Sequence, residues 1–87
     1  MLHKYLPIGS VVLLKNTKKK MLIVGLLQSV NNSEKVYDYS ACIYPFGIQD
    51  SKHLFAFDHE DIEIIYSCGY RDDEYFEMNT KMIKNSH

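Results

Sequence analysis

The densest group of side chains able to do chemistry is Asp58-His59-Glu60-Asp61, with Glu63 close behind. Such a cluster could bind a metal ion or supply an acid–base pair. A helical zinc site of the HExxH type needs its second histidine one turn on, at the place that Glu63 takes here. Alternatively, Asp58 caps one turn of helix and Asp61 is the acid of a capping box. The spacing favours capping.

The sequence lacks the other common catalytic patterns. Cys42 and Cys68 fall inside apolar strand patterns, where a thiol stays protonated and inert, and their spacing favours two buried free thiols over a disulfide. No serine lies in a G-x-S-x-G turn, and the four glycines stand singly, so no phosphate-binding loop is formed. We expect no catalytic residue, no cofactor and no metal. An enzyme acting through His59, Glu60 and Asp61 is the alternative left open.

Charge is divided unevenly along the chain, although the net charge is only −1. Residues 1–44 carry six lysines and two acids, whereas residues 45–87 carry nine acids and four basic residues. Lys18-Lys19-Lys20 could contact phosphates, but lysines at a hairpin tip also protect sheet edges from pairing. We therefore expect no nucleic-acid partner, and keep a small nucleic-acid-binding barrel as the less favoured alternative.

Short strands are the elements that must position these groups. Val11–Leu14 is a short β-branched run, and Met21–Leu27 is continuously apolar, which predicts a central strand buried on both faces. Gly25 within that run predicts a bulge, a bend or a close backbone approach. Four residues of the next strand alternate towards the core, namely Tyr37, Tyr39, Ala41 and Ile43. Residues 54–57 and 62–67 predict two further strands.

The apolar period changes after Asp72, which predicts a C-terminal helix over about residues 72–84. One helical stripe contains Tyr75, Phe76, Asn79, Met82 and Ile83. Acids crowd the start of this helix and lysines lie near its end, an arrangement that complements the helix dipole.

These elements predict a single domain over residues 1–87, of the α+β class and mainly β. We expect a small bent antiparallel sheet or SH3-like barrel of about five strands within residues 8–67, a helical turn at 58–61 and the C-terminal amphipathic helix. The longest apolar run is shorter than the ~20 residues of a membrane helix, and no export signal is visible. We expect a cytoplasmic protein without membrane insertion. Strand order, oligomeric state and the packing of the helix on its own sheet stay open.

One stretch favours binding of another protein. Residues 58–77 contain eight Asp or Glu, and Arg71 is their one Lys or Arg. This stretch is either a solvated face with helix caps or a docking surface for a basic partner, which suits the nearby tyrosines because tyrosine is enriched at interfaces. The residues most expected to contact a protein are Tyr66, Tyr70, Asp72, Asp73 and Glu74.

Taken together, several motifs resemble a small Firmicute family, domain of unknown function 4176. They are the opening Leu6 to Lys15, the run Met21 to Gly25, Tyr37-Asp38-Tyr39, Tyr44-Pro45-x-Gly47, Phe57-x-His59-Glu60-Asp61-Ile62 and Gly69-Tyr70-x-Asp72. The resemblance spans about residues 6–76. Phe46 departs from it, because that place is often acidic in the family.

The resemblance implies a setting more than a mechanism. Members of the family are commonly encoded in type VII secretion clusters beside LXG-type toxins, and no catalytic residues transfer from it. It implies a cytoplasmic chaperone or targeting adaptor that binds a secreted toxin or another secretion component. An immunity protein that neutralises a cognate toxin is the alternative.

Overall fold

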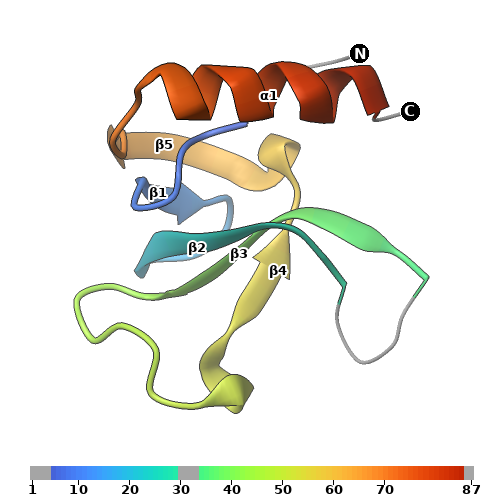
Figure 1. The fold of residues 1–87 in the computed structure, drawn as a ribbon. Helices are drawn as coiled ribbons and strands as arrows, with labels where there is room; N and C mark the ends of the chain where they lie inside the picture. The colour runs from blue at the N-terminus through green and yellow to red at the C-terminus, as the bar shows by residue number, and fades with distance from the viewer. Residues whose placement is uncertain (1–4, 30–33, 86–87) are drawn as a thin grey trace.

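The protein is an open five-stranded antiparallel sheet in the order β4-β3-β2-β1-β5, with one C-terminal helix (Figure 1). The computed structural model describes residues 5–29 and 34–85. The elements are β1 (Val11–Leu14), β2 (Lys20–Ser29), β3 (Val36–Ile43), the 3-10 turn η1 (Ser51–His53), β4 (Phe55–Phe57), the 3-10 turn η2 (His59–Asp61), β5 (Ile62–Ser67) and α1 (Asp73–Asn85). The predicted α+β, mainly β class is confirmed. Of the two architectures expected, the bent open sheet is the one observed, with β4 and β5 as its edges.

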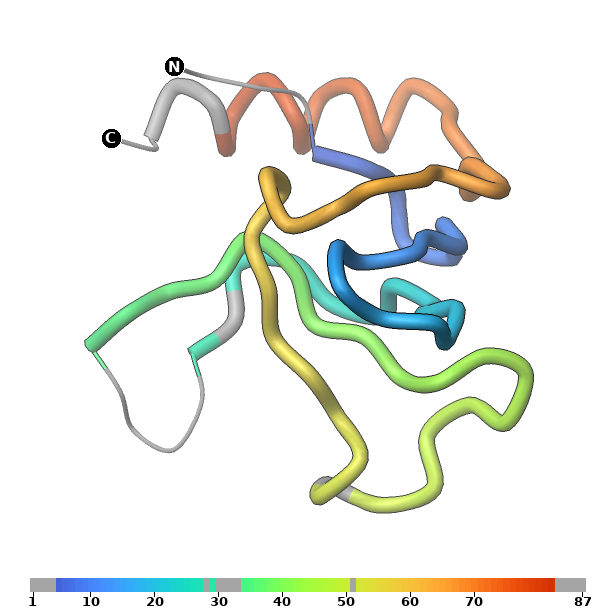
Figure 2. Tube along the Cα trace, turned by 180° about the vertical axis from the view of Figure 1, so that it is seen from behind, coloured from blue at the N-terminus to red at the C-terminus, as the bar shows by residue number. Residues whose placement is uncertain are grey.

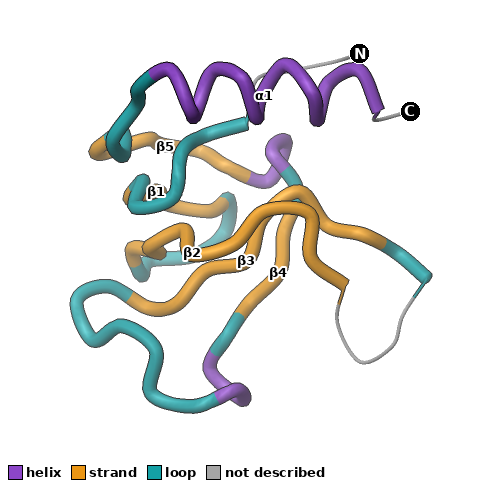
Figure 3. The backbone as a smooth tube through the Cα atoms, in the orientation of Figure 1, coloured by secondary structure: helices purple, strands orange, loops and turns teal. Residues whose placement is uncertain are grey.

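The bend of the sheet lies in β2, its longest strand. The first residues of β2 pair with β1, and β3 pairs along most of its length. The β2–β3 register shifts between Ile23 and Gly25, which confirms the irregularity predicted at the glycine. A bulge of this kind bends a strand and increases its twist. Figure 3 shows the strands fanning apart around this region, so that β1 and β4 lie at different levels.

The core lies on one face of the sheet. Its buried apolar residues are Tyr5, Val12, Met21, Ile23, Tyr39, Ala41 and Phe57. The predicted alternation in β3 is confirmed in part: Tyr39 and Ala41 are buried and Ile43 packs against the core, but Cys42, predicted on the opposite face, is buried as well. The prediction that the whole run from Met21 to Leu27 is buried was wrong, because its later residues are half-buried or exposed after the bend.

The two cysteines differ, which corrects the expectation of two buried thiols. Cys42 is buried in β3, whereas Cys68 is exposed in the loop after β5; both are free. The apolar pattern extends one residue beyond the strand. The chain leaves β5 at Ser67 because the next residues approach the backbone of the N-terminal segment.

That approach is a contact between two glycines, which we call the Gly9–Gly69 contact. A Cβ built on Gly69 would lie 2.2 Å from the carbonyl oxygen of Ile8, so no side chain fits there. Ser10 fastens the contact, because its buried hydroxyl donates to the Pro7 carbonyl (2.7 Å) and accepts from the Gly69 N–H (3.0 Å). The chain therefore runs backbone against backbone here.

The helix α1 packs on the molecule's own sheet, by way of the N-terminal segment that lies between them (Figure 1). The buried side chain of Asn79 accepts from the Tyr5 N–H at 2.9 Å, and the Tyr75 hydroxyl donates to the Tyr5 carbonyl. Met82 adds an apolar contact with the core. Phe76, predicted within the buried stripe, is instead 48% exposed, and the burial of Ile83 lies outside what the structure describes.

Candidate functional site

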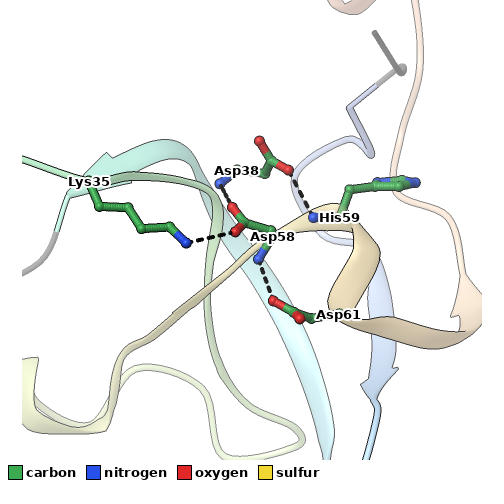
Figure 4. Close-up of polar contacts among 5 residues, drawn as sticks. All are labelled: Lys35, Asp38, Asp58, His59 and Asp61. Carbon is green, nitrogen blue, oxygen red and sulfur yellow. Dashed lines mark hydrogen bonds and ion pairs between the residues drawn. The ribbon is translucent and has the colours of Figure 1, made fainter. Parts of the chain in front are cut away.

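The predicted polar cluster lies where the chain passes from β4 to β5. Figure 2 shows β4 running towards the level of β5, where the chain turns through η2. The turn lies beside β3, where Asp58 and His59 contact Lys35 and Asp38. We call these five residues, Lys35, Asp38, Asp58, His59 and Asp61, the η2 cluster (Figure 4).

Each carboxylate of the η2 cluster accepts a hydrogen bond from a backbone amide. Asp38 Oδ2 accepts from the His59 N–H (2.9 Å), and Asp58 Oδ1 accepts from the Asp38 N–H (3.2 Å). Asp61 Oδ2 accepts from the Asp58 N–H (2.9 Å), which confirms the predicted capping box. Lys35 Nζ lies 3.2 Å from Asp58 Oδ2. The cluster ties β3 to the turn that leads into β5.

The imidazole of His59 points away from these carboxylates (Figure 4). Its Nδ1 lies 2.8 Å from the Tyr39 hydroxyl, whose oxygen also accepts from the Leu6 N–H at 2.9 Å. We assign the hydroxyl proton to the bond with Nδ1, which puts the proton of a neutral imidazole on Nε2. The side chain therefore joins η2 to the core instead of facing solvent with Glu60 and Asp61.

Two members of the acid–base group left open by the sequence make structural contacts. The His59 ring and the Asp61 carboxylate bind different partners, Tyr39 and the Asp58 amide. His53 binds Asp50 Oδ1 at 2.7 Å in η1 and does not join the cluster. Within residues 5–29 and 34–85, no three His, Cys, Asp or Glu residues are grouped so that they could hold a metal ion.

We expect the buried Tyr39 hydroxyl to make the protein less stable at alkaline pH. Burial raises the pKa of Tyr39 above its ordinary value of about 10. A raised folded-state pKa leaves stability intact below about pH 10 and removes it as pH rises further. We expect the free energy of unfolding to fall above that pH, by up to about 1.4 kcal/mol per pH unit from this group. Urea denaturation at pH values from about 8 to 11 measures the slope.

The matched control for this pH dependence is Tyr39→Phe, which should give a shallower decline. Burial also raises the pKa of Tyr75, so a smaller decline remains in both proteins. Equal slopes for the wild type and the variant would contradict the assignment to Tyr39.

The residues predicted to contact a protein lie along one stretch, from the end of β5 to the first turn of α1 (Figure 1). Tyr70 is 80% exposed and Tyr66 is 49% exposed, with Lys20 Nζ 4.8 Å from the centre of the Tyr66 ring. Asp73 and Glu74 are exposed, but Asp72 is half-buried and accepts from the Tyr75 N–H at 3.1 Å. Asp72 thus caps α1, and the structure gives it that structural role.

Sequence reasoning missed two exposed apolar residues on the same stretch. Ile64 and Ile65 are 40% and 49% exposed, on opposite sides of a strand expected to bury one face. The β1–β5 register shifts twice along this short strand. β5 is also an edge, a fact that depends on the strand order. We call residues 64–74 the β5–α1 segment.

No helix among the described residues has both the length and the apolar character needed to cross a membrane.

The comparisons with known proteins give a family. No curated protein and no solved structure matches the chain. The model of the family described as "Domain of unknown function (DUF4176)" matches residues 5–78, a span that holds the Gly9–Gly69 contact, the η2 cluster and the β5–α1 segment. The chain therefore belongs to the DUF4176 family.

Proposed function

We propose that the protein is a non-enzymatic accessory protein that binds another protein. The observation that carries this proposal is the β5–α1 segment, an edge strand with exposed Ile64, Ile65 and Tyr66 that continues into the exposed Tyr70. The edge of a sheet offers backbone N–H and C=O groups that an extended segment of another chain can pair with. Large exposed apolar and tyrosine side chains next to such an edge are typical of protein interfaces.

The charge of the segment supports a basic partner. Asp73 and Glu74 are exposed in the first turn of α1, three and four residues after Tyr70. Opposite charge on a partner would steer the encounter and select against acidic competitors. The polar η2 cluster offers a weaker case for function, because its carboxylates are occupied by the backbone amides and the lysine that they hold.

The setting that we propose comes from the family. The resemblance implies a genomic neighbourhood of type VII secretion genes. From it we propose that the partner is a secreted LXG-type toxin or another component of type VII secretion. The protein then serves as its cytoplasmic chaperone or targeting adaptor. A compact domain with an exposed sheet edge suits this role because it can pair with an export segment before that segment leaves the cell.

The test is co-expression with the products of the genes beside its own and, where one of them is an LXG-type toxin, with its export domain and its catalytic domain separately. We expect a complex with the export domain at physiological salt, and about a tenfold loss of affinity in Tyr66→Ala with Tyr70→Ala, because exposed tyrosines are frequent hot spots. Ile48→Ala is the control, since Ile48 is 60% exposed and lies outside the β5–α1 segment.

Two outcomes would overturn this proposal. A complex with the catalytic domain alone, together with rescue of cells from that domain, would replace the chaperone role with an immunity role. If no neighbouring gene product co-purifies, or if the double tyrosine variant binds as well as Ile48→Ala, the assignment of the function to the β5–α1 segment fails.

A further inference from the structure

A second surface lies at the lysine turn, between β1 and β2, where it meets the loop after β3. Two adjoining hollows of about 330 and 390 Å³ share Lys19 and Ile43. We call them together the lysine groove. The β3–β4 loop, which supplies one wall, extends away from α1 (Figures 1 and 3). The groove is therefore separate from the first turn of α1.

The floor of the groove is apolar and fixed in place. Met21 is buried, Leu14 and Ile43 are half-buried and pack against the core, and Phe55 is 40% exposed beside them. Because these side chains are held by the core, the floor is formed before any partner arrives. Preorganisation of this kind reduces the entropy lost on binding.

The rim of the groove is basic. Lys18, Lys19 and Lys20 are exposed, and the wall facing them carries Tyr44 and Phe46, the latter 71% exposed. The Tyr44 N–H donates to the Lys20 carbonyl at 2.9 Å, which holds the two walls together. The lining that the structure describes includes three lysines and no carboxylate. An apolar floor under a charged rim is the usual composition of a protein interface.

We infer that the lysine groove binds an acidic segment of a partner protein, with an apolar side chain of that segment seated on Met21 and Ile43. Charge complementarity selects the acidic segment, and the hollow over the floor, at the lower end of the range of ligand pockets, accommodates one or two apolar side chains. This goes beyond the proposed function because it assigns a second surface, of opposite charge to the β5–α1 segment.

Single-stranded nucleic acid suits the groove less well. Its binding sites place aromatic rings in succession along a basic track, so that consecutive bases stack. Here the groove does carry Tyr44, Phe46 and Phe55, but Leu14, Met21 and Ile43 form its floor, and the basic charge of its lining is confined to one turn. A peptide with an apolar anchor uses both the floor and the rim.

The probe for the test is a short fluorescein-labelled peptide of Asp and Glu with one Leu and one Phe. Its comparison peptide has every Asp and Glu replaced by Asn and Gln. We expect fluorescence anisotropy to show binding of the acidic peptide that weakens with added salt, and at least about tenfold weaker binding of the neutral one. Lys18→Glu with Lys19→Glu should weaken binding of the acidic peptide by about tenfold or more, and Phe46→Ser should weaken it by less.

The matched control reverses the same amount of charge elsewhere. Arg71→Glu with Lys81→Glu changes two exposed cations outside the groove and should leave peptide affinity within about twofold. Tyr70→Ala keeps the contact between Lys20 and the Tyr66 ring and should also leave peptide affinity unchanged, so a failure of the proposed function and a failure of this inference give different results. Equal binding of both peptides, or equal effects of the two double charge reversals, would overturn the inference.

The other occupants of the groove give their own signatures. Tighter binding of oligothymidine than of the acidic peptide, lost in Lys18→Glu with Lys19→Glu, would make the groove a nucleic-acid site. Concentration-dependent self-association in sedimentation, lost in the same variant, would make a second copy of this chain the occupant, through its own acidic β5–α1 segment. Either result would overturn the inference in favour of that occupant.

Discussion

Gly69→Ala is expected to lower the free energy of unfolding by about 3 kcal/mol, at the upper end of what overpacking costs. The added Cβ would lie 2.2 Å from the Ile8 carbonyl oxygen and 3.0 Å from the Ile8 carbonyl carbon, distances at which backbone must move. Moving it disturbs the Gly69 N–H bond to the buried Ser10 hydroxyl. In a domain of this size the melting temperature should fall by more than about 10 °C, measured by thermal and urea denaturation.

Gly47→Ala is the control for the loss of a glycine. Gly47 has a φ of +80°, but nothing lies within 4 Å of the place that an added methyl group would take, so only backbone strain of about 1 kcal/mol is expected. The difference between the two variants measures the steric part at Gly69. If Gly69→Ala unfolds no more easily than Gly47→Ala, the Gly9–Gly69 contact is not the tight junction described here.

Tyr39→Phe is expected to destabilise the protein by about 2 kcal/mol, although it removes a single oxygen atom. That oxygen accepts from the Leu6 N–H and lies 2.8 Å from His59 Nδ1, so its loss leaves a part-buried amide and an imidazole without this partner. An unsatisfied buried polar group costs about 1–3 kcal/mol. The ring remains packed against Tyr5 and Phe57, so the change isolates the hydrogen bonds.

The control for this variant lies two residues earlier on the same strand. Tyr37→Phe also removes one hydroxyl, from a half-buried ring that keeps its contact with Lys35 Nζ at 4.6 Å. Its effect should stay within about 0.5 kcal/mol. Urea denaturation at neutral pH compares the two, and equal losses would show that the Tyr39 hydroxyl has no special role.

The parts of the fold that the sequence predicts are those with a local signal. Period-two alternation located β3, because one of its faces packs on the core, and Gly25 located the bulge in β2. The capping box at Asp58 and Asp61 was predictable because its two members lie three residues apart. Such signals depend on residues close together in the chain, so they can be recognised without knowing the strand order.

The rest depends on residues far apart in sequence. The bond from the His59 N–H to Asp38 spans 21 residues, and the bond from the Tyr5 N–H to Asn79 spans 74. No periodic pattern in the sequence indicates these two hydrogen bonds. The exposure of Ile64 and Ile65 follows from β5 being an edge, and the lysine groove arises because β3 ends beside the turn before β2. The exposure of Ile64 and Ile65 and the lysine groove were therefore not predicted from the sequence.

The bonds from α1 to Tyr5 also bear on the order of events during synthesis. The buried Tyr5 backbone finds its partners in Asn79 and Tyr75, residues that the ribosome adds 74 and 70 positions later. The strands can pair one after another as the chain emerges. The N-terminal segment that lies over them, however, gains its hydrogen bonds to α1 only when the helix has formed. In a nascent chain that ends before α1, the N-terminal segment lacks its hydrogen bonds to the helix. Contacts between residues so far apart in sequence form slowly, and until they form apolar surface stays accessible to other chains.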